Sequence, residues 1–414
     1  MTRIGIVGTG ISGLQLALTL QWAGVETTLY AEKTPDEMRA GRLPNTVVRF
    51  GPAVQRERAI GVDHWDSTID AMHVSVADTP ISFCGRAAEP ASAVDFRVYL
   101  PRLLETYLAR GGDVVYGALG ADEVVDRSAW HDLTVIATGR ESIGAFFPRD
   151  EQRSPFTAPQ RRLCTALYRG IAAPEPFGGS MTLAPGAGEI FSFPFVSRHD
   201  GPVANILFEA IPGGPLEPLA RMPYADDPQA FDALALDLVA RYAPQLHARI
   251  DPAEFGVSDP RDLLQGALTP VVRRPYCEVA PGRFVVAVGD AYVTNDPIGG
   301  QGANLGSACA AVVARAICQD VAYDEWFCRA LARDMWALAE PVVQFNNALL
   351  APPPPHVQEI LGAAWQDQAV ADAFANNFAH PDAMWRAIAT PERARTFLAS
   401  AGSLPALAAA TLAA

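Results

Sequence analysis

The feature that most constrains this chain is a glycine motif near its N-terminus. Gly8, Gly10 and Gly13 are spaced G-x-G-x-x-G, between an apolar stretch, IGIV, and a segment with apolar residues at helical spacing, LQLALTL. A second strand-like stretch, VETTLY, follows. This strand–turn–helix–strand order is the context in which the motif binds a dinucleotide. The sequence therefore predicts a short buried strand, a tight turn and a helix whose N-terminus faces phosphate groups.

Each position of the motif requires glycine for a different physical reason. Gly8 permits the tight turn, Gly10 lets a pyrophosphate approach the backbone, and Gly13 lets the helix pack closely against the strand. Ile11 and Ser12 begin the helix, whose first turn offers unpaired N–H groups and a positive dipole. We therefore expect all five residues to bind the cofactor.

An acidic residue commonly follows the second strand of such a unit and binds a ribose hydroxyl. Here Ala31 occupies the usual position and Glu32 comes next. We expect Glu32 to bind the ribose, and the alternative is a solvated strand end.

Two further glycine corners indicate which dinucleotide is bound. The segment DLTVIATGRES contains Thr138 and Gly139, and the segment GDAYVTNDPIGGQGANLGS begins at Gly289. A chain whose first, middle and last thirds each bring a strand end to one crevice resembles the FAD domain of the aromatic-hydroxylase flavoproteins. That resemblance implies that Asp290 binds a ribitol or ribose hydroxyl and that the flavin ring lies against residues 297–304. The expected FAD contacts in these corners are Thr138, Gly139, Gly289, Asp290, Pro297, Gly300, Gly302, Ala303 and Asn304.

Longer segments narrow the resemblance to one family of flavoproteins. The stretches GRLPNTVVRFGPAVQRE, VDFRVYLPRLLE, SPFTAPQRRLC, RIDPAEF and GDAYVTNDPIGGQGAN resemble the oxygenase component of the two-component styrene and indole monooxygenases. The family implies FAD that a separate flavin reductase delivers in reduced form. Oxygen then gives a flavin C4a-hydroperoxide, which epoxidises styrene-like vinyl aromatics or indole. The implied partners are the reductase, a small aromatic substrate and O₂.

The same resemblance implies residue roles around the substrate. Arg42 matches an arginine near the FAD pyrophosphate. Asn45 is the expected catalytic residue, and the expected substrate contacts are Asn45, Val47, His73, Ser92 and Pro297.

Arg49 departs from the family pattern. A charged side chain in an apolar pocket is costly unless it is paired. We therefore expect Arg49 to face an FAD phosphate or solvent, and we expect Arg97 to brace the two lobes.

The residues themselves favour an outside reductase. Single-component hydroxylases carry a D-G corner that helps to receive NADPH, whereas this chain has Ala137-Thr138-Gly139 and no second dinucleotide fingerprint. Halogenation is disfavoured because there is no W-x-W-x-I-P segment and the only lysine, Lys33, lies at the adenosine end. Two alternatives stay open: a single-component NAD(P)H-dependent aromatic hydroxylase and a flavin-binding protein without turnover.

Composition excludes several classes of partner. A formal net charge of −14 argues against nucleic acid and against an anionic membrane surface. No apolar run is long enough to span a bilayer, and the opening lacks the pattern of a signal peptide. The six cysteines and seven histidines lack metal-ligand spacing, so we expect no metal, free thiols and a cytoplasmic location. The sequence leaves the oligomeric state open, and a homodimer is one option.

The expected fold class is α/β. It combines a Rossmann-like FAD-binding domain of the aromatic-hydroxylase type with a β-sheet substrate domain and a helical C-terminal tail. We expect the tail to contain a helix broken at Pro341 and core tryptophans at 326, 336, 365 and 385. The expected boundaries are 1–45, 95–160 and 260–323 for the FAD-binding domain, 46–94 and 161–259 for the substrate-binding domain, and 324–414 for the tail.

Overall fold

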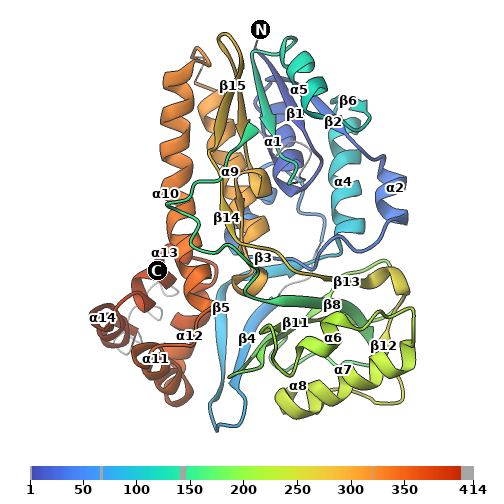
Figure 1. Ribbon diagram of the computed structural model, residues 1–414, viewed down its shortest axis with the longest axis vertical. Helices are drawn as coiled ribbons and strands as arrows, with labels where there is room; N and C mark the ends of the chain where they lie inside the picture. The colour runs from blue at the N-terminus through green and yellow to red at the C-terminus, as the bar shows by residue number, and fades with distance from the viewer. Residues whose placement is uncertain (1, 66–68, 140–145, 320, 402–414) are drawn as a thin grey trace, which may run out of the picture.

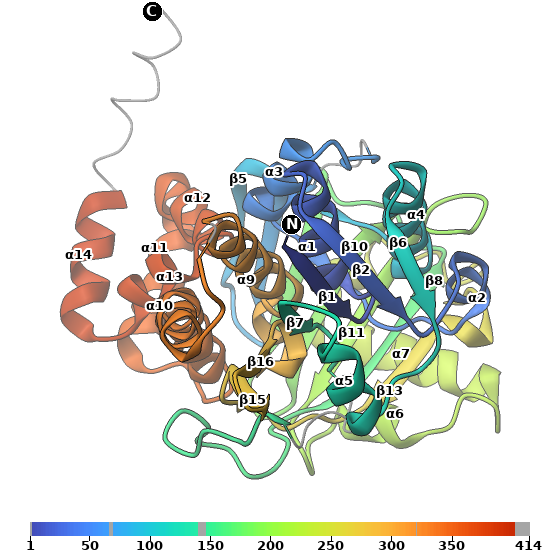
Figure 2. The same cartoon turned by 90° about the horizontal axis from the view of Figure 1, so that it is seen from above.

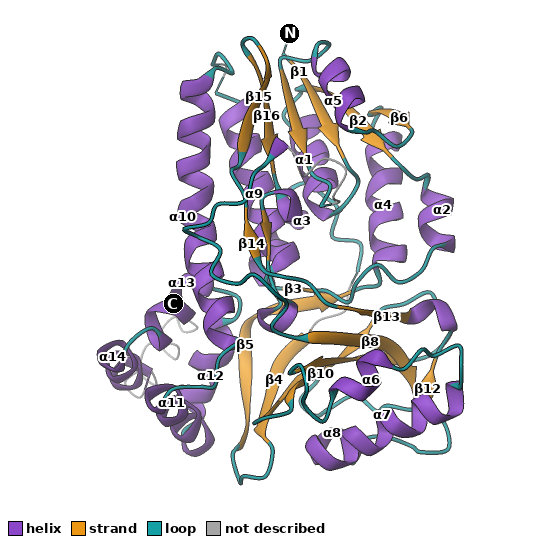
Figure 3. Ribbon diagram, viewed as in Figure 1, coloured by secondary structure: helices purple, strands orange, loops and turns teal. Residues whose placement is uncertain are grey.

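The computed structural model describes residues 2–65, 69–139, 146–319 and 321–401. Two sheets dominate the structure, one above the other in Figure 3, with the C-terminal helices along one side. The fold class expected from the sequence is confirmed. No helix within the described ranges is both long enough and apolar enough to cross a bilayer.

The first sheet brings the three glycine corners to one edge. Its strand order is β15-β16-β7-β1-β2-β6, in which β1 pairs in parallel with β2 and β7, and β7 pairs in parallel with β16. Because the carboxyl ends of parallel strands meet at the same edge, Gly8, Gly139 and Gly289 lie next to one another there. The strands are β1 (Arg3–Val7), β2 (Glu26–Ala31), β6 (Asp113–Tyr116), β7 (Leu133–Ile136), β15 (Tyr276–Ala280) and β16 (Arg283–Ala287).

Helices pack around this sheet through one large hydrophobic core (Figures 1 and 2). Helix α1 is buried along nearly its whole length, because it lies between the sheet and the helices α4 and α9. The helices of this part are α1 (Ile11–Trp22), α2 (Pro35–Ala40), α3 (Gly51–Ala59), α4 (Phe96–Ala109), α5 (Ala121–Ser128) and α9 (Gly302–Ile317).

The second sheet is larger and mostly antiparallel. Its order is β12-β8-β11-β10-β9-β4-β5-β3, and β13 also pairs with β8. The sheet therefore continues into Leu263–Gly266, past the boundary at residue 259 that the sequence indicated. The strands are β3 (Val48–Arg49), β4 (Ile69–Val76), β5 (Ser82–Ala93), β8 (Arg162–Arg169), β9 (Gly178–Ala184), β10 (Gly188–Phe195), β11 (Val203–Ala210), β12 (Gly256–Val257) and β13 (Leu263–Gly266).

One face of the second sheet is covered by short helices and by α7. Phe231 of α7 is fully buried and Leu238 is nearly so, while Leu234 and Tyr242 pack at the margin of the same core. The opposite face is left to line a cavity. The covering helices are α6 (Glu217–Arg221), α7 (Pro228–Tyr242) and α8 (Pro244–His247), and a small separate sheet pairs β14 (Val271–Val272) with β17 (Val293–Thr294).

The C-terminal region is helical, with two differences from expectation. Helix α10 runs without a break through Pro341, because Val342, Val343 and Phe345 beyond the proline are buried and hold the helix in place. Trp326 and Trp365 are 78% and 44% exposed, so they are not core residues. The helices are α10 (Glu325–Leu349), α11 (Pro355–Gln366), α12 (Gln368–Asn377), α13 (Pro381–Ile388) and α14 (Pro391–Ala401).

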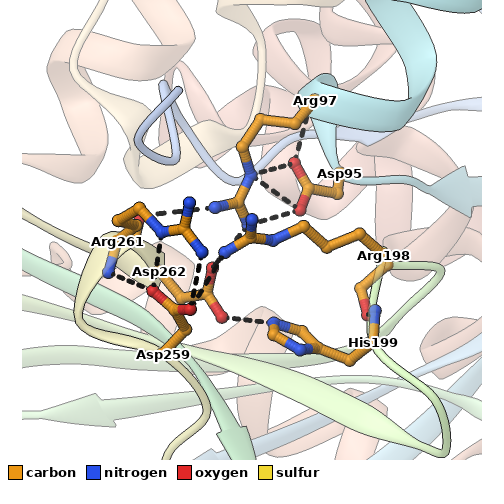
Figure 4. Close-up of polar contacts among 8 residues, drawn as sticks. Asp95, Arg97, Arg198, His199, Asp259, Arg261 and Asp262 are labelled. Atoms are coloured by element: carbon orange, nitrogen blue, oxygen red, sulfur yellow. Dashed lines mark hydrogen bonds and ion pairs between the residues drawn. The ribbon is translucent and has the colours of Figure 1, made fainter. Parts of the chain in front are cut away.

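A buried ion cluster joins the two sheets. Arg97, in the first turn of α4, donates to Asp95 at 2.5 Å and forms an ion pair with Asp262, just before β13, at 2.6 Å (Figure 4). Asp262 is also reached by His199 at 2.5 Å and Arg198 at 3.3 Å, from the turn between β10 and β11. Arg97 therefore braces the two lobes, as the sequence suggested.

Arg97→Leu should destabilise the protein by about 3–5 kcal/mol, because Asp95 and Asp262, both without exposed surface, would lose their shared cation. Denaturant unfolding at neutral pH measures the change. Arg102→Leu, at an exposed position of the same helix, is the matched control and should cost less than about 1 kcal/mol. A loss for Arg97→Leu no larger than that of the control would contradict the role of the cluster.

Candidate functional site

A cavity of about 980 Å³ separates the glycine edge of the first sheet from the open face of the second. Sites for single small ligands commonly measure about 300–1,000 Å³, so this cavity is at the upper end of the range. Most of the site residues expected from the sequence line it. These are Gly8, Gly10, Ile11, Ser12, Glu32, Arg42, Asn45, Val47, Thr138, Gly139, Gly289, Asp290, Pro297, Gly300, Gly302 and Ala303.

At the phosphate-binding end of the cavity, the backbone of α1 packs directly against the turn that follows β1. Gly8 has a φ of 111°, which favours glycine. A Cβ on Gly13 would lie 2.1 Å from the carbonyl oxygen of Gly8, so only glycine lets α1 approach β1 this closely. Gly10, at the N-cap of α1, has no side-chain cap, and the first N–H groups of the helix are left for a ligand.

Arg42 adds a cation to this end of the cavity. Its side chain is exposed at the cavity wall, and it has no salt-bridge partner within the described residues. The guanidinium is therefore available for a bidentate phosphate contact.

The second and third corners fit against each other at Asp290. A Cβ on Gly139 would lie 2.5 Å from the Cβ of Asp290, so the glycine is needed for the approach. Asp290 opens into the cavity, and its enclosure there raises the pKa of the carboxyl, while Arg273 acts in the opposite direction. A carboxyl group at this place can accept hydrogen bonds from sugar hydroxyls.

The loop after Asp290 is shaped to face a ligand with its backbone. Gly300 has a φ of 66°, a left-handed conformation that favours glycine. Gly302 has no other atom within 4 Å of the position of a Cβ, because that position lies in the cavity. A flat ring system can therefore lie against this backbone.

Asn304, an expected FAD contact, does not line the cavity. Its amide nitrogen donates to the carbonyls of Val48 at 2.9 Å and Gly300 at 2.8 Å, and its oxygen accepts from the Phe50 N–H at 2.9 Å. The side chain fixes the loop to the segment between β3 and α3. Gly13 is likewise a packing residue rather than a wall residue.

Two amide groups at the cavity lack partners. The Oδ1 of Asn45 and the Nδ2 of Asn295 are buried and, among the described residues, have no hydrogen-bond partner. Buried polar atoms of this kind cost free energy unless a ligand or water satisfies them. The sequence predicted Asn45 but not Asn295, although Asn295 directly precedes the Asp-Pro pair of the glycine-rich segment.

Two expected substrate contacts lie away from the cavity. His73 on β4 faces the carbonyl of Pro176, with its Nε2 2.8 Å from that oxygen. Ser92 on β5 is buried and accepts a hydrogen bond from Arg49 at 2.9 Å. Neither is among the described residues that line the cavity, so the expectation of a substrate contact does not match this structure at either position.

Arg49 faces neither phosphate nor solvent, so that expectation was wrong. The side chain is 2% exposed, is paired with Glu57, and lies over the ring of Tyr99 at 4.3 Å. Glu57 also accepts hydrogen bonds from Gln15 at 2.9 Å and Tyr99 at 2.7 Å. Burial, and then the charge of Glu57, raise the pKa of Tyr99 well above its usual value. The cost of burying the cation is offset by this pairing, which joins α1, α3 and α4.

The far end of the cavity is apolar. Phe191 and Phe193 of β10, Leu207 of β11, and Phe378 after α12 form its walls. No histidine or cysteine is among the described residues that line the cavity, and no group of three or more metal-ligating side chains occurs in the described ranges. The site therefore combines a dinucleotide cradle with a largely apolar pocket and offers few groups for acid–base or nucleophilic chemistry.

The residues fit FAD as the bound group. The close approach at the three corners, the open space at Gly302 and the unsatisfied amides of Asn45 and Asn295 all face the same cavity. Helices α1 and α9 also begin at this cavity, so that both helix N-termini face it.

Comparison with known proteins supports this assignment. Residues 139–249 match the family model described as "Styrene monooxygenase A putative substrate binding domain". The chain is 36% identical to the styrene monooxygenase StyA of a Pseudomonas species and 35% identical to that of Pseudomonas fluorescens, in each case over 94% of this chain and 96% of the relative. Among solved structures, the flavin-dependent brominase Bmp2 has the same fold, with a TM-score of 0.60, 13% identity, and coverage of 97% of this chain and 94% of that one.

Gly302→Leu should abolish FAD binding and leave the fold intact, because the new side chain would occupy the cavity without meeting other protein atoms. Thermal-shift titration should show that FAD stabilises the wild type, that NAD does not, and that FAD does not stabilise the variant.

Gly362→Leu is the matched control, since Gly362 is also helical with open space at the Cβ position but lies on α11, away from the cavity. Normal FAD binding by Gly302→Leu, or stabilisation of the wild type by NAD equal to that by FAD, would contradict the assignment.

Proposed function

Because the chain belongs to the styrene monooxygenase family, we propose that it epoxidises styrene-like vinyl aromatics with reduced FAD supplied by a separate flavin reductase. The protein is an FAD-dependent monooxygenase. The observation that carries the substrate proposal is the cavity itself, which joins the glycine edge to a chamber walled by Phe191, Phe193, Leu207 and Phe378.

We propose that the two sheets divide the work. The first sheet and its helices hold FAD, through the N-terminus of α1, Arg42 and Asp290. The open face of the second sheet holds the substrate, which agrees with the description of the family model over residues 139–249. When bound, reduced FAD supplies an electrophilic oxygen atom from O₂, and the rest of the task falls to the protein.

That task is to orient an alkene and to exclude water. The aromatic ring of a vinyl arene would pack against Phe191, Phe193 and Phe378, which leaves the vinyl group toward the loop at Pro297. A dry pocket limits the loss of activated oxygen as hydrogen peroxide. Asn45 is the polar group that we propose to hydrogen-bond the reacting oxygen, because an amide is not a general acid that would discharge it.

A separate reductase is proposed because the chain has one dinucleotide fingerprint, which FAD would occupy. The cysteines lie unpaired, in keeping with a reducing compartment, and we propose the cytoplasm.

Indole is the second substrate that we propose. Glu89 lines the cavity, and its Oε2 is buried without a partner within the described residues. A carboxylate there can accept a hydrogen bond from the indole N–H.

The test is product analysis with chemically reduced FAD, O₂, and styrene or indole. We expect styrene oxide, and indigo from indole, without any pyridine nucleotide. Rapid oxidation of NADPH by the isolated protein would instead identify a single-component hydroxylase. Reoxidation of bound flavin without product would identify a flavin-binding protein that lacks turnover.

Asn45→Ala should keep FAD binding but uncouple the reaction, so that oxygen is consumed while hydrogen peroxide rises and epoxide falls. Loss of one such hydrogen bond costs about 1–3 kcal/mol, which lowers the productive fraction by roughly one to two decades. The ratio of peroxide to epoxide measures the effect. Unchanged coupling would place Asn45 outside the reaction, and complete loss of FAD binding would make it a structural residue.

A further inference from the structure

Two carboxyl groups meet in the interior behind the glycine-rich loop. Glu209 on β11 has no exposed surface, and Asp296, in the loop, is 1% exposed. The carboxyl of Glu209 lies at hydrogen-bonding range of the carboxyl of Asp296. Within the described residues, no N–H group and no other side-chain donor reaches either oxygen of Glu209 or the Oδ2 of Asp296.

The sheet register puts this pair at the floor of the cofactor cavity. Residues 205, 207 and 209 of β11 share one face, and Asn205 and Leu207 line the cavity. Glu209 is the next residue on that face, opposite Glu189 of β10. At this point the loop of residues 295–300 covers the sheet, and every member of the loop except Asp296 lines the cavity.

The charges around the pair do not balance if every carboxyl is ionised. Arg161 is the cation of the cluster, and it donates to both oxygens of Glu189 at 2.7 and 2.9 Å. Glu189, Glu209 and Asp296 would then carry three negative charges against one positive charge in a buried space. Two ionised carboxylates in contact without a donor are strongly unfavourable, and one of them keeps its proton.

We propose that Glu209 stays protonated, donates a hydrogen bond to the Asp296 carboxylate, and in this way positions the loop of residues 295–300 against the cofactor. Glu209 is then a positioning residue that acts through Asp296. The proposal rests on the placement of the flavin ring at this loop.

The other contacts of Asp296 explain how its hydrogen bond with Glu209 can hold the loop in position. The Oδ1 of Asp296 accepts from the N–H of Ile298 at 3.3 Å, and the side chain of Asn346 on α10 donates to its carbonyl. A Cβ on Gly299 would lie 2.1 Å from the Oδ1 of Asn346, so the loop is closely packed on this side too. Movement of Asp296 would therefore displace the backbone that faces the cavity.

Protonation is consistent with the electrostatic surroundings. Burial, the charges of Asp296 and Glu189, and the hydrogen bond with Asp296 all raise the pKa of Glu209, while Arg161 opposes them more weakly. Burial also raises the pKa of Asp296, although the hydrogen bonds from Glu209 and Ile298 lower it in part. The proton therefore resides on Glu209.

Infrared spectroscopy of the apoprotein at neutral pH tests the protonation directly. The difference between the spectra of the wild type and Glu209→Gln should contain the C=O band of a protonated carboxylic acid, lost in the variant. A difference that shows loss of an ionised carboxylate would overturn the proposal.

The pH dependence of unfolding gives a second readout without cofactor. In the unfolded chain Glu209 ionises near 4.5, whereas its pKa in the folded state is higher. Above pH 4.5 the unfolded state therefore binds fewer protons, and the wild type loses stability as pH rises. Its unfolding constant should grow by about tenfold per pH unit relative to that of Glu209→Gln, until the folded state also ionises. Glu254→Gln, at an exposed position in the same lobe, should show no such divergence.

Binding of oxidised FAD tests the positioning role. Glu209→Gln keeps a donor toward Asp296, so its Kd should stay within about threefold of the wild type. Glu209→Leu removes the donor and should raise the Kd by about tenfold or more, since it leaves a buried carboxylate unpaired. Adding Asp296→Asn to Glu209→Leu removes that charge and should recover most of the affinity.

The outcomes separate the two proposals. FAD binding by Glu209→Leu equal to that of the wild type would overturn the positioning role, as would failure of Asp296→Asn to improve it. If the wild-type protein oxygenates neither styrene nor indole, the proposed function fails while the infrared and unfolding results stand on their own.

Discussion

The structure depends on the close approach of the backbone at Gly289 and Gly306 to the side chain of Ser12. A Cβ on Gly289 would lie 2.7 Å from its hydroxyl oxygen, and a Cβ on Gly306 would lie 2.3 Å from the same atom. Helix α1, helix α9 and the end of β16 can therefore meet at one point only because two of the three positions are glycine. This contact turns the N-termini of both helices toward one cavity. The dipoles of α1 and α9 then act on one ligand, although the helices begin almost 300 residues apart in the sequence.

Around this centre, three clusters of buried charge are each built on an arginine. Arg49 with Glu57 fixes α3 to the core of the first lobe, Arg97 with Asp262 joins the lobes, and Arg161 with Glu189 holds the second sheet near the end of α10. A planar guanidinium satisfies a carboxylate through two parallel hydrogen bonds, which offsets part of its desolvation. All three clusters lie at the cavity or at the elements that support it, and their carboxylates are paired with guanidinium groups. Phe191, Phe193, Leu207 and Phe378 are thus left to form an apolar wall for the substrate.

The candidate site was predictable wherever function depends on local backbone geometry. A glycine is required where the chain turns tightly or a ligand touches the backbone, and such positions show as glycines in any context, as at Gly8, Gly139 and Gly289. Single side chains were predicted less well. The resemblance implied His73 and Ser92 as substrate contacts, but His73 faces the carbonyl of Pro176 in the segment before β9, and Ser92 accepts from Arg49 on the neighbouring strand. Asn304 was placed in the right loop, yet it binds backbone rather than facing the cavity.

The sequence by itself determined the α/β class, the phosphate cradle and the three corners, since each follows from strand and helix periodicity and from glycine spacing within about 20 residues. Only the tertiary structure decided which charges are paired. Arg49 of β3 meets Glu57 of α3 and the ring of Tyr99 of α4, and Glu209 meets Asp296 from a strand 87 positions earlier. Those contacts depend on how the two sheets pack. The sequence around a charged residue does not indicate which distant residue will be its partner. The protonation of Glu209 follows from burial together with that partner, and both exist only in the folded protein.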